Sequence, residues 1–271
     1  MEPAEYARFT GRLRAALEAD PRVVGLVALG SMAGAGTAPD AFSDHDFFVI
    51  TTPGAQEPFR TDLSWLPEGD RVVLSHRETE HGLKVLLDDA HLLELAVFDL
   101  DELGVARANR YAVLLDRGGV AERMADVAAK RDASPDDPWL AGQLLGNLLV
   151  GAGRAARGEL LSARLFVAGH AARHLLTLLA RHVPPEAPAL LDDLDPFRRF
   201  ERAYPGLGSA LNGALARPPL EAALALLELA DAEVGGRVPS WPARAVAAVR
   251  GRLHAWRDGP GAAGVPGGGA A

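Results

Sequence analysis

The chain has 271 residues, of which 48% are hydrophobic, so it is long enough to form one large domain or two ordinary ones. It contains no cysteine, which excludes disulfides and thiolate metal sites. It has no apolar run of about 18 residues, so no membrane span is predicted. The first 20 residues carry charges of both signs without the apolar core of a secretory signal, and a cytoplasmic protein is expected.

The net charge of −8 is unevenly distributed along the chain. Residues 1–136 carry a balance of −10, whereas residues 137–271 carry a balance of +2. An acidic half without a basic patch argues against a nucleic-acid surface, so no nucleic-acid partner is expected. The acidic charge is compatible with metal ions or a cationic small molecule, and equally with ordinary solubility charge.

The first 130 residues alternate between helical and extended patterns. A helix is predicted over residues 3–19, and a short second helix is predicted to include residues 59–66. Apolar, β-rich runs mark strand candidates, and together they predict a mixed α/β sheet of about five strands, with an antiparallel hairpin at "DDAH". The candidates are residues 23–29, 44–51, 71–76, 83–89, 92–99 and 111–119.

The chain changes character at the Pro- and Asp-rich joint "RDASPDDPW", after which strand patterns vanish. Apolar residues at helical spacing predict a bundle of helices over residues 139–158, 160–182, 191–204, 219–236 and 241–257. We therefore expect an α/β domain over residues 1–132 and an all-α helical bundle over 133–258. A small-residue tail over 259–271 is expected to be disordered.

Two aspartates lie at the start of a predicted buried strand, in "SDHDFFVIT". Alternate side chains of a strand share a face, so Asp44 and Asp46 should point the same way, with His45 opposite. Two neighbouring carboxylates repel each other, and a divalent cation with oxygen ligands relieves that repulsion. A third acid, Glu94, interrupts the apolar strand "LLELAVFD" and is the best candidate to complete the metal site.

The pair Gly30-Ser31 follows the first predicted strand and precedes a segment that could open a helix. Backbone N–H groups at a helix N-terminus bind anions, and glycine lets a phosphate approach the backbone closely. The Ser31 hydroxyl can donate to a phosphate oxygen. A phosphate cradle beside a carboxylate pair indicates a nucleotide bound as its metal complex.

These residues together resemble a known family. The stretch "LGSMAGAGTAPDAFSDHDFFVI" resembles the Gly-Ser…Asp-x-Asp signature of the polymerase-β-like nucleotidyltransferase superfamily, and "LLELAVFD" is similar to its third-acid strand. The layout is similar to the antibiotic nucleotidyltransferases, including the streptomycin/spectinomycin and lincosamide enzymes, which couple a small α/β catalytic domain to a helical C-terminal domain. The helical half matches in architecture alone.

The resemblance implies an Mg²⁺-dependent enzyme that binds ATP or another NTP. A hydroxyl of an acceptor would attack the α-phosphate in line, so that a nucleoside monophosphate is transferred and pyrophosphate leaves. Asp44 and Asp46 would hold the metal ions, and Glu94 would complete the catalytic ion's shell or take the acceptor's proton. Ser31 and the Gly30 backbone would hold the triphosphate.

The favoured hypothesis is an adenylyltransferase that modifies a small hydroxylated acceptor, placed between the two domains. An aminoglycoside-type antibiotic fits the acidic half. Two alternatives stay open, which are AMP transfer to a protein partner, as in antitoxin-like relatives of the superfamily, and a non-catalytic nucleotide-binding protein on the same fold. The sequence predicts no oligomeric state.

The individual residues also have simpler interpretations. Ser43-Asp44 could start an ordinary turn. Glu94 could be a buried acid paired with Arg77 or Arg110. His91 is expected at a strand end on the surface. The run "GAGRAARG" imitates part of a dinucleotide fingerprint, but no strand precedes it, so a helix is expected there.

Overall fold

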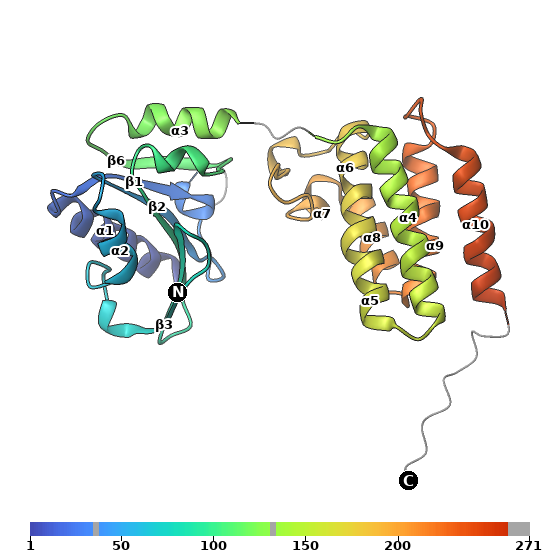
Figure 1. The fold of residues 1–271 in the computed structure, drawn as a ribbon, viewed down its shortest axis with the longest axis horizontal. Helices are drawn as coiled ribbons and strands as arrows, with labels where there is room; N and C mark the ends of the chain where they lie inside the picture. Colours follow the sequence, from blue (N-terminus) through green and yellow to red (C-terminus); the bar gives the residue numbers. More distant parts are fainter. Residues whose placement is uncertain (35–37, 131–133, 260–271) are drawn as a thin grey trace, which may run out of the picture. The chain divides into compact units, whose positions relative to one another are not determined.

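The computed structural model describes residues 1–34, 38–130 and 134–259. The chain divides into two compact units, residues 1–132 and 133–271, and each is described by itself (Figure 1). The expected domain boundary at 132/133 and the expected tail, apart from Gly259, lie outside the described residues. An α/β unit followed by an all-α unit confirms the predicted fold class.

The first unit contains a mixed six-stranded sheet, one strand more than expected. Its spatial order is β3-β4-β5-β2-β1-β6. The central pair β2/β5 is parallel, and all other neighbours in the sheet are antiparallel, including the predicted hairpin β4/β5. The strands are β1 Val23–Leu29, β2 His45–Thr51, β3 Val72–Arg77, β4 Gly82–Leu87, β5 Leu92–Phe98 and β6 Tyr111–Asp116.

Helices cover both faces of this sheet (Figure 1). On one face lie α1 (Pro3–Ala19) and α2 (Gln56–Thr61), whose apolar side chains pack with alternate residues of the central strands. On the other face lies α3 (Val120–Ala129), which packs against the intervening residues. Both sets of alternating side chains in the central strands are therefore buried, one set under each layer of helices.

Helix α1 matches the predicted residues 3–19, and its buried side chains recur at intervals of three and four residues. Helix α3 was not among the predicted helices, although its buried residues Val120, Met124 and Val127 recur at helical spacing. Its N-terminus is capped by the Asp116 carboxylate, which accepts from the N–H groups of Gly118, Val120 and Ala121 at 2.9–3.2 Å. The short helix predicted around 59–66 begins earlier, at Gln56.

The second unit consists of helices around one apolar core. The predicted helices 139–158, 219–236 and 241–257 appear as α4, α9 and α10. None of the described helices of the protein has the length and apolar character needed to cross a membrane. The α-helices of this unit are α4 Asp137–Ala156, α5 Leu160–Arg164, α6 Ala172–His182, α7 Phe200–Ala203, α8 Pro205–Leu215, α9 Pro219–Val234 and α10 Ala243–Asp258.

The helix predicted over 160–182 forms as one run that contains a π-helical segment. Between α5 and α6, residues Leu165–Ala171 adopt π-helical geometry. This segment lies close to α4, since a Cβ added at Gly151 would lie 2.6 Å from Val167 Cγ2 and 3.2 Å from the Ala163 carbonyl oxygen. Glycine at position 151 therefore allows the two helices to approach each other.

The helix predicted over 191–204 is wrong. That stretch is mostly turns, with one helical turn in α7, and the real helix is α8. Its sequence, "PGLGSALNGAL", contains three glycines, which lower its helical propensity and hid it from a pattern-based prediction. Tertiary contact stabilises it, because a Cβ at Gly208 would lie 2.4 Å from Glu201 Cα in α7.

Two glycines of α8 should respond in opposite ways to alanine. We expect Gly208→Ala to lower the free energy of unfolding by roughly 1–3 kcal/mol, because the new methyl group overlaps the α7 backbone. Gly213, which is exposed and has nothing within 4 Å of an added Cβ, should gain roughly 0.5–1 kcal/mol from the same change. Urea unfolding followed by tryptophan fluorescence measures both effects.

The fluorescence signal reports mainly on this unit, since three of the four tryptophans, Trp139, Trp241 and Trp256, belong to it. Equal effects of the two substitutions would contradict the packing assigned to Gly208.

Candidate functional site

The structure brings together the three carboxylates singled out in the sequence. Asp44 immediately precedes β2, Asp46 is on β2 and Glu94 is on β5. One oxygen of each carboxylate lies within 4.8 Å of the others, and all three residues are partly exposed. Asp46 and Glu94 are direct partners in the parallel β2/β5 register. Their role as metal ligands stays a prediction. The pairing of β2 with β5 is what brings the carboxylates close together.

Strand alternation places His45 on the opposite face, as expected. The three acids lie on the α3 face of the sheet, whereas the His45 ring is fully buried against α1. The two faces of the sheet therefore differ. The α3 face carries the carboxylates at its edge, and on the α1 face the buried His45 ring holds β2 against helix α1.

A lysine lies beside the carboxylate cluster. Lys84, on β4, is the cross-strand partner of Glu94, and its Nζ is 2.9 Å from Glu94 Oε1 and 3.0 Å from Glu78 Oε1. These two carboxylates raise the pKa of Lys84 above its ordinary value, and Glu94 has the larger effect. The alternative that paired Glu94 with Arg77 is wrong, because Arg77 binds Glu57 with two hydrogen bonds of 2.7 and 2.8 Å.

Gly30, the residue immediately after β1, lies beside the carboxylate cluster. Its φ of +51° lies in the left-handed region that favours glycine, and a Cβ there would be 3.3 Å from Asp46 Oδ2. The backbone thus runs directly beside the Asp46 carboxylate. The Gly30 N–H donates to the Arg110 carbonyl at 3.2 Å and so already has a partner within the fold. A role of the Gly30 backbone in holding a triphosphate stays a prediction.

The predicted helix after Gly30 is a four-residue 3-10 turn, Gly30–Ala33. A turn of this length lacks the aligned peptide dipoles of a longer helix, so the expected helix-dipole contribution to anion binding is absent here. Ser31, partly exposed in the same turn, remains the candidate hydroxyl donor to a phosphate oxygen.

A buried polar network fixes the backbone at Asp44. The Tyr6 hydroxyl donates to the Asp44 carbonyl at 2.9 Å, and the Tyr6 ring stacks on His45 with centroids 3.7 Å apart. Burial, the largest cause, raises the pKa of Tyr6 to about 12, so this hydroxyl remains a donor at neutral pH. Helix α1 is therefore attached to the residue before β2 through a side chain that sequence inspection missed.

The hydrogen bonds assign the tautomers of the buried histidines. The Thr10 hydroxyl donates to the Tyr6 carbonyl at 3.0 Å and must therefore accept from His45 Nε2, 3.1 Å away. His45 Nδ1 is then an acceptor, and His91 Nε2 donates to it at 2.7 Å. The expectation that His91 lies on the surface is wrong. His91 is buried, and its donated hydrogen bond to His45 satisfies a polar group of each ring in the core.

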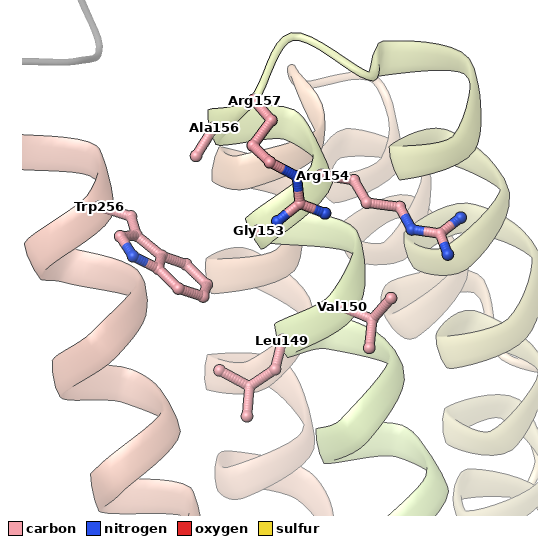
Figure 2. Close-up of a pocket in the computed structure, with 7 residues that line it drawn as sticks. All are labelled: Leu149, Val150, Gly153, Arg154, Ala156, Arg157 and Trp256. Carbon is pink, nitrogen blue, oxygen red and sulfur yellow. The ribbon is translucent and has the colours of Figure 1, made fainter.

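The arginine-rich run "GAGRAARG" lies in the last turns of α4 and the residues after it, which agrees with the expected helix. Arg154 and Arg157 line a hollow of about 470 Å³ together with Trp256 of α10 (Figure 2). Both have partners inside this unit, since Arg154 lies 4.3 Å from the Phe166 ring centroid and Arg157 Nε donates to Glu159 at 2.8 Å.

Comparisons with known proteins find similarity among solved structures. No protein-family model and no curated protein sequence matches the chain. Among solved structures, the chain is similar to an aminoglycoside 6-adenyltransferase from Bacillus subtilis, at 14% sequence identity and a TM-score of 0.39. That match covers 92% of this chain and 97% of the other.

The buried histidine should make the stability of the α/β unit depend on pH. Burial and the neighbouring His91 lower the pKa of His45 to about 3, from its ordinary value of 6.5. Between these values the unfolded chain binds a proton that the folded chain does not. The free energy of unfolding should therefore fall as the pH falls below 6.5, by about 1.4 kcal/mol per pH unit from this group.

Urea unfolding at pH 7.5, 6.5 and 5.5 measures this dependence. His45→Gln should be less stable than the parent chain at pH 7.5 but should lose less of its stability between pH 6.5 and 5.5. Parallel pH profiles for the two proteins would show that His45 is not the titrating group.

Proposed function

We propose that the protein is a metal-dependent nucleotidyltransferase that moves a nucleoside monophosphate, AMP from ATP, onto a hydroxyl of a small acceptor. The observation that carries the proposal is the convergence of the Asp44, Asp46 and Glu94 oxygens within 4.8 Å. The ordered motif supports it, since Gly30 and Ser31 immediately follow β1, which pairs with β2, the strand that carries Asp46.

The donor set fits Mg²⁺, which is a hard cation that prefers carboxylate oxygens and is commonly held through one or two carboxylates plus substrate phosphates. Asp44, Asp46 and Glu94 would hold the ion. When bound, Mg²⁺ would neutralise charge on the phosphate oxygens and lower the pKa of a coordinated oxygen. The partial exposure of all three residues leaves room for substrate oxygens beside them.

The protein residues would position the reactants and receive a proton. The acceptor oxygen forms a bond to the α-phosphorus, the bond from that phosphorus to the bridging oxygen breaks, and pyrophosphate leaves. Glu94 would hold the ion through one carboxylate oxygen, and its other oxygen would take the acceptor's proton. The Ser31 hydroxyl would donate to a phosphate oxygen.

The acidic balance of residues 1–136 favours a cationic acceptor, and an aminoglycoside-type molecule has both the cationic amines and the hydroxyls required. Incubation with Mg²⁺ and ATP labelled at the α- or γ-phosphate tests the proposal. The α-label should appear on a small acceptor from an aminoglycoside panel, and the γ-label should leave as pyrophosphate. Label on a polypeptide from lysate would instead support transfer to a protein, and no transfer of α-label to any acceptor would contradict the proposal.

Asp46→Asn should reduce turnover by more than about 100-fold while the protein stays folded. The change removes a metal ligand from the rim of the sheet, and even indirect partners of metal ligands are worth about 10–100-fold. Steady-state release of pyrophosphate gives the rate, and circular dichroism checks the fold.

A matched control is Asp126→Asn, which makes the same chemical change at an exposed position of α3. It should leave turnover unchanged. Unfolding of the Asp46 variant, or full activity in it, would contradict the assigned role.

A further inference from the structure

Lys84 joins the candidate metal site to a carboxylate outside it. It occupies the middle of β4, opposite Glu94 of β5, and its side chain is 32% exposed. Its ammonium group is shared almost equally between Glu94 and Glu78, at 2.9 and 3.0 Å. Glu78 follows β3 and is not part of the three-carboxylate cluster. The ammonium therefore has one partner that would hold a metal and one that would not.

The choice of lysine at this position is informative. The chain has 28 basic residues, of which two, Lys84 and Lys130, are lysines. Arginine forms paired, directional hydrogen bonds with carboxylates, whereas lysine is a compact point charge on a flexible stem. An arginine opposite Glu94 would fix that carboxylate firmly. A lysine can neutralise it and yet be displaced at small geometric cost.

The cluster has opposite requirements with and without a divalent cation. Without one, three neighbouring carboxylates repel each other, and a nearby ammonium lowers that repulsion. With a divalent cation on Glu94, a second positive charge at the same carboxylate is repelled. Glu78 gives the ammonium a partner in that state, so it need not be left unpaired.

We propose that Lys84 is a resident counter-cation of Glu94 that competes with the divalent metal, and that Glu78 retains Lys84 when the metal is bound. This inference rests on the proposed function, because it needs a metal at the three carboxylates. Lys84 thus acts through Glu94, as a positioning residue, and it sets the metal concentration at which the site is half occupied.

Metal affinity should rise in the Lys84→Met variant and fall in the Lys84→Arg variant. A purely structural ion pair would give the opposite order. Binding of Mn²⁺ alone to the full chain is measured by the loss of the free Mn²⁺ electron paramagnetic resonance signal. Lys84→Met removes the competing cation and should tighten binding about tenfold. Lys84→Arg should weaken it, because the guanidinium holds Glu94 more firmly.

Glu78→Gln tests the second half of the inference. With its other partner gone, the ammonium is held by Glu94 alone, so Mn²⁺ binding should weaken. If Lys84 merely braces Glu94 in a productive position, arginine should preserve affinity and methionine should lower it. That reversed order, or equal affinity in the Lys84→Met and parent proteins, would overturn the inference.

Two further variants separate this inference from the proposed function. Lys130→Met removes the other lysine, which donates to the Gly104 carbonyl, and it should leave Mn²⁺ affinity unchanged. Asp46→Asn should lose Mn²⁺ binding. If the parent protein binds Mn²⁺ no better than Asp46→Asn does, the metal site itself is contradicted. If Asp46→Asn loses Mn²⁺ binding, but Lys84→Arg binds Mn²⁺ more tightly than Lys84→Met, only the proposed role of Lys84 is contradicted. Circular dichroism of each variant checks that it is folded.

Discussion

The parallel pairing of β2 with β5 creates the charge arrangement on which the candidate site depends. In that register Asp46 is the direct neighbour of Glu94, and Asp44 lies close to both. Backbone hydrogen bonds between two central strands hold these groups together, so their repulsion cannot be relieved by separation. A nearby cation relieves it. Lys84 supplies one positive charge from the next strand, and the proposed metal would supply more.

The opposite face of β2 gives the site its rigidity. His45, between the two aspartates in sequence, has Tyr6, Phe9 and His91 around it and is fully buried. Tyr6 binds the main-chain oxygen of Asp44, so it fixes the backbone without occupying a carboxylate oxygen. The same network also reaches the candidate ligand surface, because the Tyr6 hydroxyl interacts with the side chain of Ser31.

The features that sequence alone predicted are those that depend on short-range periodicity. The strand bearing Asp46, the shared side of the two aspartates and the central place of Glu94 all follow from alternation along a strand. Lys84 was not recognised, because its importance comes from a cross-strand register that no local pattern encodes. The burial of His91 likewise depends on the distant Tyr6 and Phe9 of α1. Helix α8 escaped notice because packing on α7, and not propensity, stabilises it.

The charges of the cluster bear on how it would take up metal. Once Glu78 retains the Lys84 ammonium, the three carboxylates have a formal charge of −3, which one divalent cation reduces to −1. A second divalent cation would then meet a single net negative charge, with weaker electrostatic attraction from the protein than the first one. Further negative charge to attract it must come from elsewhere, and a triphosphate is the substrate group that carries such charge. In a two-metal reaction of the proposed kind, the second ion would therefore arrive with the nucleotide, and the protein alone would bind one.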